Sequence, residues 1–521
     1  MNLIKTGKIL DPIHGLIQIT EIEEYIINQR IFGRLRKVKQ NTLLNYVFPG
    51  ANHSRFEHSL GVMHLAEVIF HNSNENVKIA RVKNERDPEN NDYIEAKSVY
   101  DFERNNKILL VRLQELRLAA LLHDVGHGPT SHKFDDFTTT GEGLMKILKS
   151  NPDFFGKYID LFKVYIEKKG LDKNINHELV SCVFIISLIK TLKLYKSLTK
   201  ESILIVEEIS IDNILKMIEP DFLPDYEIMI GDGNFSDYFN SIIASFPFDA
   251  DRMDYLYRDS FYSGVKYGFF DQSRILTSLL PINAKDRYTL GIKMSGLDSV
   301  IRFIQSRNHL YNQVYFHKTN SATNSMLDFI FGDLNINVLE DIQEFVDYEN
   351  FYCENSDEYF FNVTLRNILQ ENHCTNCENV LNDLLNRKLW KRCYEKRENV
   401  ADFLKFDTKK FDESKLKVIK SELNSEGIFI QENYCSNIGL KGFYNSKGEI
   451  KTKSVVIDKK GKLITQNWDS ITDEMKFLNQ TNTFIKRIYV NRKGKMENEL
   501  SEIEEVVRGK FIEHGLIDIE N

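Results

Sequence analysis

Histidine and aspartate occur together where an apolar stretch of this chain ends. His123 and Asp124 directly follow a run rich in Leu and Ala, and burying such polar side chains costs free energy unless each has a partner. A divalent metal ion would satisfy both, because neutral imidazole and carboxylate are ligands of transition metals. A single His–Asp pair is more often a helix cap or a hydrogen-bonded core arrangement, so the pair alone does not define a site.

Further histidines and an aspartate extend this pair into a pattern. His58 lies upstream in the segment Arg-Phe-Glu-His, and Asp251 lies downstream, where another helix is expected to begin. His127 and His132 follow the pair within nine residues. The chain therefore has the order His … His-Asp … Asp with more histidines beside the pair, which favours a metal-dependent reaction over a purely structural role.

This order resembles that of the HD phosphohydrolase superfamily. Within the superfamily it is most similar to the deoxynucleotide triphosphohydrolase branch, which includes dGTPases and SAM-and-HD-domain dNTPases. The resemblance covers about the first 330 residues and is diffuse beyond them. The segments that carry it are 11–15, 34–40, 46–62, 121–132, 176–178 and 251–259. For the fold, it implies a mainly α protein, with an HD-domain helical catalytic core and a smaller C-terminal mixed α/β lobe.

The resemblance implies a metal centre surrounded by catalytic side chains. The centre would hold a divalent transition metal (Mn, Fe, Zn or Ni), and Mg²⁺ would accompany the substrate triphosphate. The implied metal ligands are His58, His123, Asp124 and Asp251. The implied catalytic residues, which would position water, hold phosphate and protonate the leaving 5′-oxygen, are His127, His132, Asp135 and His177. The residues alone do not decide which histidine is the general acid.

The chemistry of a triphosphate explains why such groups are needed. The substrate carries about four negative charges near neutral pH, and hydrolysis adds charge to the leaving group and the nucleophile. A metal acts as a Lewis acid on a phosphoryl oxygen, and Arg contacts phosphate through two N–H groups. By position in the family's motifs, the phosphate ligands would be Arg55, Arg252 and Arg307; the sugar-reading residues would be Gln40, Tyr255 and Asp259; and Tyr315 would flank the base. Ordinary helix packing is the alternative role of both tyrosines.

The implied activity is cleavage of a dNTP into deoxynucleoside and inorganic triphosphate. The implied partners are the dNTP, a nucleotide effector bound between subunits, and other copies of the chain in a tetramer or hexamer. In the regulatory guanine pocket, Asn28 and Gly33 stand where relatives carry Asp and Gln, although Arg36 is present. Regulation by GTP through that pocket is therefore not expected. The cellular role would be control of the nucleotide pool or depletion of dNTPs in antiviral defence.

Two other functions stay open at this point. The same kind of metal site serves hydrolases of other nucleotides and of phosphodiesters, although the sugar-reading set Gln40, Tyr255 and Asp259 argues against them. A nucleic-acid-binding protein with a vestigial site is suggested by residues 441–495, which hold 13 Lys and Arg against 5 Asp and Glu. The intact set of metal ligands argues against a vestigial site.

The composition restricts the class of protein. The chain has 521 residues and a formal net charge of −8, so no chain-wide attraction to nucleic acid is expected. No apolar run of about 18 residues predicts a membrane span, and six scattered Cys do not form a disulfide framework, which favours the cytoplasm. Cys374 and Cys377 form one CxxC half-site, but a structural zinc needs a second pair, so ordinary intracellular cysteines are expected.

The elements that must position these side chains are mostly helices. Apolar patterns predict helices at 59–70, 108–123, 140–170, 176–198, 201–219, 242–262, 295–331 and 361–423. Short strands are expected at 281–293, 455–457, 463–464 and 485–490. The predicted domains are a catalytic core at 1–330 with a surface insertion at 72–107, a helical extension at 331–424 and a mixed α/β lobe at 425–521.

Overall fold

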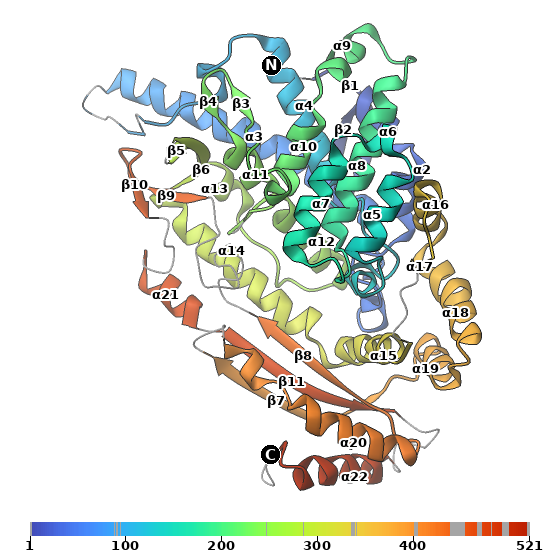
Figure 1. Cartoon of the computed structure of the whole chain (residues 1–521). Helices are drawn as coiled ribbons and strands as arrows, with labels where there is room; N and C mark the ends of the chain where they lie inside the picture. The colour runs from blue at the N-terminus through green and yellow to red at the C-terminus, as the bar shows by residue number, and fades with distance from the viewer. Residues whose placement is uncertain are drawn as a thin grey trace.

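A computed structural model shows a large helical body with a smaller unit of strands and helices beside it (Figure 1). The described residues are 3–87, 89, 92–93, 95–245, 247–284, 286–334, 339, 341–400, 405–437, 454–465, 471–480, 482–491 and 500–517. Of the basic segment 441–495, residues 441–453, 466–470, 481 and 492–495 lie outside the described residues. The mainly α fold with a smaller C-terminal part containing strands is confirmed.

The body consists of helices joined by short loops and turns. Its helices are α1 (Glu21–Ile27), α2 (Arg30–Gly33), α3 (Arg55–Arg86), α4 (Asn106–Leu122), α5 (Gly141–Lys149), α6 (Pro152–Phe155), α7 (Tyr158–Lys169), α8 (His177–Leu194), α9 (Lys200–Glu208), α10 (Ile211–Ile218), α11 (Ser236–Ile243), α12 (Ala250–Ser263), α13 (Gln272–Leu276), α14 (Leu297–Leu310) and α15 (Lys318–Leu334). The helices that follow are α16 (Phe345–Glu354), α17 (Asp357–Tyr359), α18 (Leu365–Glu371), α19 (Thr375–Leu385), α20 (Glu413–Ser425), α21 (Asp473–Gln480) and α22 (Leu500–Glu513).

The long helix α3 lies at the centre of the body, where it packs against α4 and α12. The side chains of α4 from Leu113 to Leu122 are all buried, because this helix is apolar around most of its circumference. Helix α8 is likewise buried from Leu179 to Ile189. These buried helices carry the predicted site residues at or near their ends, so the core holds the site rigidly.

Strands form a hairpin, two larger sheets and a small pair. The hairpin joins β1 (Lys5–Asp11) to β2 (Gly15–Thr20), and β3 (Met229–Ile230) pairs with β4 (Gly233–Asn234). The order β10-β9-β6-β5 forms a four-stranded sheet, and β7-β11-β8 forms a three-stranded sheet. Their bounds are β5 (Leu279–Ala284), β6 (Arg287–Lys293), β7 (Lys391–Val400), β8 (Ile430–Asn437), β9 (Val455–Ile457), β10 (Leu463–Thr465) and β11 (Asn482–Val490).

The structure confirms the predicted strands but differs from the predicted elements in several places, and three of them concern the predicted insertion and the C-terminal strands. Helix α3 continues to Arg86, so the first part of the predicted insertion is helical rather than irregular. Strand β7 lies inside the stretch predicted as helical at 361–423; it alternates charged residues without apolar periodicity, and pairing with β11 makes it a strand. Strand β9 pairs in parallel with β6 of the body. The predicted domain boundaries stay predictions.

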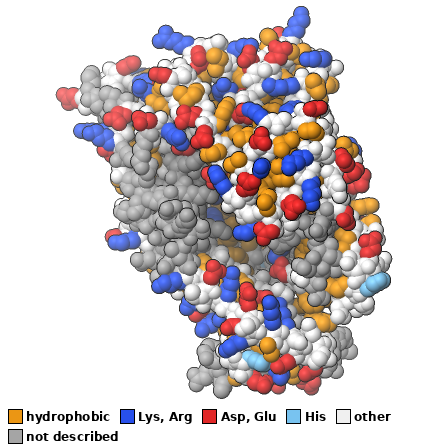
Figure 2. Space-filling view, viewed as in Figure 1, with side chains coloured by type: hydrophobic (Ala, Val, Ile, Leu, Met, Phe, Trp, Pro, Cys, Tyr) orange, Lys and Arg blue, Asp and Glu red, His pale blue; other side chains and the backbone are white. Residues whose placement is uncertain are grey.

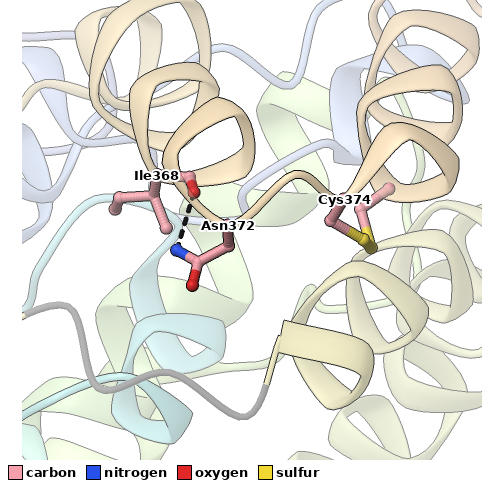
Figure 3. Close-up of a disulfide and its surroundings, with 4 residues drawn as sticks. Ile368, Asn372 and Cys374 are labelled. Carbon is pink, nitrogen blue, oxygen red and sulfur yellow. Dashed lines mark hydrogen bonds between the residues drawn. A yellow bond between two sulfur atoms is a disulfide. The ribbon is translucent and has the colours of Figure 1, made fainter.

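The cysteines also differ from expectation. Cys374 and Cys377 form a disulfide, with Cα atoms 5.4 Å apart, where α19 begins (Figure 3). Neither sulfur is then a thiolate that could bind zinc. Cys182, Cys353, Cys393 and Cys435 are free thiols.

None of the helices in the described part of the chain is both long and apolar enough to cross a bilayer. On the face shown in Figure 2, the coloured Lys and Arg side chains are interspersed with Asp and Glu. This mixture of charges agrees with the small net charge of the whole chain.

Candidate metal and nucleotide site

His58 lies in the first turn of α3 with its side chain completely buried. The helix begins where the Ser54 backbone N–H donates to the Glu57 carboxylate at 2.7 Å, a local N-terminal cap. The Nδ1 atom of His58 donates to Asp254 Oδ2 at 2.7 Å, which directs Nε2 into the site. That Nε2 atom lies 3.1 Å from Asp251 Oδ1.

His123 and Asp124 follow the last residue of α4, as the sequence pattern predicts. The Nδ1 atom of His123 donates to the Ala120 carbonyl at 2.8 Å, so its Nε2 atom also faces the site. This Nε2 lies 3.4 Å from Asp124 Oδ1 and 3.8 Å from Asp251 Oδ1. Asp124 Oδ2 accepts a hydrogen bond from Arg55 at 2.5 Å and lies 3.6 Å from His58 Nε2.

These side chains fit a divalent metal ion. His58, His123 and Asp251 each offer a ligand atom, and the three atoms lie within 4.8 Å of one another. The buried Nε2 atoms of both histidines have no hydrogen-bond partner among the described residues, which would be costly without a bound cation. Asp124 lies beside this group, where its carboxylate could serve both Arg55 and a metal. Imidazole and carboxylate donors together suit Mn, Fe, Zn or Ni.

The electrostatics of the group also favour a cation. Burial opposes a charge on His58, but Asp251 and Asp254 outweigh this effect and raise the pKa of His58 to about 10. Burial is likewise outweighed at His123, where Asp124 and Asp251 raise the imidazole pKa. Without a metal the carboxylates thus draw protons onto both histidines, and a metal would compete with those protons.

The four predicted metal ligands, His58, His123, Asp124 and Asp251, are called the metal group. Asp254 connects this group to a second layer of side chains. One turn beyond Asp251 on α12, its carboxylate accepts from His58, from His14 Nε2 at 2.7 Å, and from Arg258 at 2.8 and 2.9 Å. Arg258 also donates to Asp11 at 2.8 Å. Sequence reasoning placed these residues inside matching segments but assigned them no role. The signal was the three-residue spacing, which puts Asp251 and Asp254 on one face of a helix.

The three other predicted histidines, His127, His132 and His177, form a second group beside the metal group, called the histidine group. The rings of His127 and His177 stack with centroids 3.7 Å apart, and His132 lies 4.7 Å from His127 and 4.9 Å from His177. His127 Nε2 lies 3.4 Å from Asp124 Oδ1. His177 Nδ1 donates to Asp135 Oδ2 at 2.7 Å. The structure therefore brings all four predicted catalytic residues together.

Their protonation differs with their surroundings. Burial and the Arg55 cation lower the pKa of His127 well below its usual value. Partial loss of hydration and the same cation lower the pKa of His132, although this side chain is exposed in the cleft. Burial also acts on His177, but the hydrogen bond to Asp135 and the charge of Glu178 outweigh it and raise the pKa of His177. His177 is therefore the histidine of this group that holds a proton most strongly.

The loop between the two groups is fixed by contacts that sequence reasoning missed. Buried Arg34 donates to the carbonyls of Val125 and His127 at 2.6 and 2.7 Å. The Ser181 hydroxyl of α8 donates to the His123 carbonyl and accepts from the Gly126 N–H, both at 2.8 Å. A Cβ atom at Gly126 would lie 2.2 Å from the His177 carbonyl oxygen, so glycine lets the loop approach α8.

A cleft of about 380 Å³ opens beside these groups. The predicted residues that line it are Gln40, Arg55, His132, Tyr255, Asp259 and Tyr315. Two predicted phosphate ligands are not among its lining residues. Arg252 is held by the Asp249 carboxylate. Buried Arg307 lies over the Tyr311 ring, with 4.3 Å between its Cζ atom and the ring centroid.

Asp259 organises the part of the cleft predicted to read the sugar. Its carboxylate accepts from His53 Nε2 at 2.6 Å, from Asn41 Nδ2 at 3.0 Å and from the Tyr315 hydroxyl. His53 and Asn41 were not predicted, although both lie in or next to the segments that carry the family resemblance. Tyr311, which also lines the cleft, was missed as well.

Comparisons with known proteins agree with this geometry. The HD domain family matches residues 55–174. Uncharacterized protein YwfO of Bacillus subtilis is 28% identical over 318 residues, which cover 61% of this chain and 53% of that protein. Deoxynucleoside triphosphate triphosphohydrolase SAMHD1 of Danio rerio is 27% identical over 333 residues, 61% of this chain and 43% of the relative. The human protein of that name is 26% identical, over 62% of this chain and 44% of the relative.

The chain carries an HD domain, and its resemblance to the dNTP triphosphohydrolase branch of HD-domain proteins is confirmed. The matched part spans about half the length of the first curated relatives, 48% and 53%. These matches support a hydrolase whose substrate is related to a nucleotide. HD domains bind divalent metals, and the described His and Asp side chains could hold one.

Proposed function

We propose that this chain is a metal-dependent triphosphohydrolase that cleaves a dNTP into deoxynucleoside and inorganic triphosphate. One observation carries the proposal: Arg55, which pairs with Asp124, and His132 line the same cleft as Gln40, Tyr255, Asp259 and Tyr315. A site for phosphate hydrolysis therefore adjoins side chains suited to a sugar. The similarity to proteins named deoxynucleoside triphosphate triphosphohydrolase adds support.

In this proposal His58, His123, Asp124 and Asp251 hold a single transition metal ion, Mn, Fe, Zn or Ni. When bound, the ion acts as a Lewis acid on a phosphoryl oxygen. Mg²⁺ accompanies the triphosphate. Arg55 contacts phosphate from the wall of the cleft, and Arg252 and Arg307 do so after turning from Asp249 and Tyr311.

We propose His177 as the general acid, because it holds a proton more strongly than His127 and His132 do. Water adds to the α-phosphorus and releases one of its two protons to the solvent, and the bond from that phosphorus to the 5′-oxygen breaks. The 5′-oxygen takes a proton from the general acid to become the hydroxyl of the deoxynucleoside, and a proton from the solvent restores the acid. His177 is suited to donate that proton because Asp135 raises its pKa. His127 and His132, whose pKa values are lowered, stay neutral and position water or phosphate.

The side chains predicted to contact the sugar account for a preference for deoxynucleotides. Tyr255 would occupy the space that a ribose 2′-hydroxyl needs, while Asp259 and Gln40 would bind the 3′-hydroxyl. Buried polar groups left without a partner discriminate strongly between substrates. Asp259 is buried and already accepts three hydrogen bonds, so it is held in place before a sugar binds.

The test is a product analysis of each dNTP incubated with Mn²⁺ or Mg²⁺, with and without other nucleotides as activators. We expect deoxynucleoside and triphosphate from the unaltered chain. His123→Ala and Asp124→Ala should lose metal and activity together, whereas His177→Ala should keep its metal and lose about 10²- to 10⁴-fold in rate. His309→Ala, an exposed histidine outside the cleft, is the matched control. Absence of deoxynucleoside from every dNTP would refute the proposal, and pyrophosphate or monophosphate products would indicate another HD hydrolase.

We further propose that the chain forms a homo-oligomer, a tetramer or hexamer, with a nucleotide effector between subunits. GTP is not the expected effector, because Asn28 and Gly33 replace the guanine-reading side chains. Arg36, which remains, lies over the Phe56 ring with 3.7 Å between its Cζ atom and the centroid. Sedimentation of the chain with each nucleotide would test both statements. A monomer under all conditions would contradict the oligomer, and assembly induced by GTP would contradict the exclusion of GTP.

A further inference from the structure

Part of the cleft wall is formed by α15 and by the three-stranded sheet. The lining residues there are Asn320, Ser321 and Asn324 of α15 and Asn433 and Cys435 of strand β8. In Figure 1, β8 runs directly beneath α15, and the two elements are in contact. The three-stranded sheet is therefore part of the cleft wall and not a separate appendage.

Buried hydrogen bonds fix this sheet against the cleft. Arg487 of β11 donates to the Phe316 carbonyl and to the Ser321 hydroxyl, both at 2.8 Å, and to the Glu395 carboxylate of β7 at 2.6 Å. The Tyr489 hydroxyl donates to the Lys318 carbonyl at 2.6 Å. Because Arg487 and Tyr489 are almost completely buried, their hydrogen bonds hold this part of the cleft wall in place.

Three side chains in this part of the cleft wall are neutral amides, those of Asn320, Asn324 and Asn433. Alternate residues of a strand share a face, so Asn433 and Cys435 both face α15, and the Cys435 sulfur lies 3.7 Å from the Ser321 hydroxyl. Residues four apart share a helix face, so Asn320 and Asn324 lie together. The lysine that reaches this region, Lys133, is paired with Asp328 at 2.5 Å.

Much of the hydrogen-bonding capacity of these amides is uncommitted. Asn320 donates one N–H to the Tyr315 carbonyl at 2.9 Å, and Asn433 accepts from the weak Cys435 thiol donor at 3.3 Å. The side-chain amide of Asn324 makes no hydrogen bond to any residue that the structure describes, although it lines the cleft. Each primary amide offers two donors and an acceptor, a set that matches the edge of a nucleobase.

We propose that Asn324 and Asn433 read the edge of the nucleobase and determine which dNTP is preferred. This inference rests on the proposed function. The metal group takes the phosphates and Asp259 takes the sugar, so a base attached to that sugar occupies the remainder of the same cleft, which α15 and β8 also line. The Tyr311 and Phe316 rings line this cleft as well. Neutral amides suit a base edge, where neutral donors and acceptors alternate.

The test compares Asn324→Ala and Asn433→Ala with the unaltered chain on all four dNTPs. We measure kcat/KM for each dNTP, and also dissociation constants in a His123→Ala background, where turnover is blocked. Loss of a neutral hydrogen bond predicts that the preferred dNTP falls about threefold to tenfold relative to the least preferred. Asn362→Ala, an exposed amide far from the cleft lining, should leave every ratio unchanged.

A second variant predicts which dNTP should lose most. Asn324→Asp removes both donors and keeps acceptors, so dTTP, whose base edge is rich in carbonyl acceptors, should lose at least about threefold against dATP and dCTP. Equal falls for all four dNTPs, in rates and in dissociation constants, would overturn the inference. If no dNTP is hydrolysed but the dissociation-constant ratios shift, the proposed function fails and base reading stands.

Discussion

Replacing Asp254 with asparagine tests how the second layer supports the metal group. The change keeps the size of the side chain and removes its charge. Four short contacts reach the carboxylate, from His58 and His14 at 2.7 Å and from Arg258 at 2.8 and 2.9 Å. His58, Asp254 and Arg258 have side chains that are 0% exposed, so water cannot replace the lost charge.

The expected magnitudes follow from these contacts. Breaking a buried ion pair costs about 3–5 kcal/mol of folding free energy, and we expect the lower end because Arg258 keeps Asp11 at 2.8 Å. An amide also orients His58 less firmly than a carboxylate, and loss of such support weakens metal affinity about 10- to 100-fold. Asp254→Asn should therefore lose about 3 kcal/mol in the free energy of unfolding and bind metal about 10- to 100-fold more weakly.

Two assays separate these effects. Urea unfolding of the metal-free chain reports the free energy of unfolding, and competition with a chelating dye reports metal affinity. Asp225→Asn, an exposed carboxylate far from the site, is the control and should change neither quantity. If Asp254→Asn bound metal within twofold of this control, the conclusion that Asp254 orients His58 toward the metal would be wrong.

Two further substitutions probe the histidine group. Asp135→Asn removes the carboxylate charge and weakens the hydrogen bond that together raise the pKa of His177. Because the acid must be protonated, the rate falls as pH rises through that pKa, and the descending alkaline limb of kcat should move to lower pH. An unchanged limb would show that His177 is not the acid. Gly126→Ala would put a Cβ atom 2.2 Å from the His177 carbonyl and 2.3 Å from the Ser181 nitrogen; displacement of α8 should cost about 1–3 kcal/mol of stability and, through the shift of His177, up to about 10²-fold in kcat. Wild-type activity together with wild-type urea unfolding would contradict this account.

Some long-range arrangements could not be predicted because their causes are not local. Strand β7 lies inside a stretch expected to be helical, and its own residues, mostly Lys, Arg and Glu, have no apolar alternation that would indicate a strand. It is a strand because β11 pairs with it and Arg487 meets Glu395 across the two strands. Helix α3 runs beyond its apolar stretch to Arg86, where its buried residues include Val77 and Ala80.

The amino-acid sequence by itself determined the identity and order of the residues predicted to form the site. His58, the His123–Asp124 pair and Asp251 could be named because their order resembles that of the HD superfamily and because metal ligands are restricted to a few residue types. Helix periodicity indicated the elements that carry them. The tertiary structure alone decided that Asp254 links His58 to His14, that Arg252 turns to Asp249, and that β8 lines the cleft. Those contacts join segments far apart in the chain, and their formation depends on packing of the whole core, which no local pattern encodes.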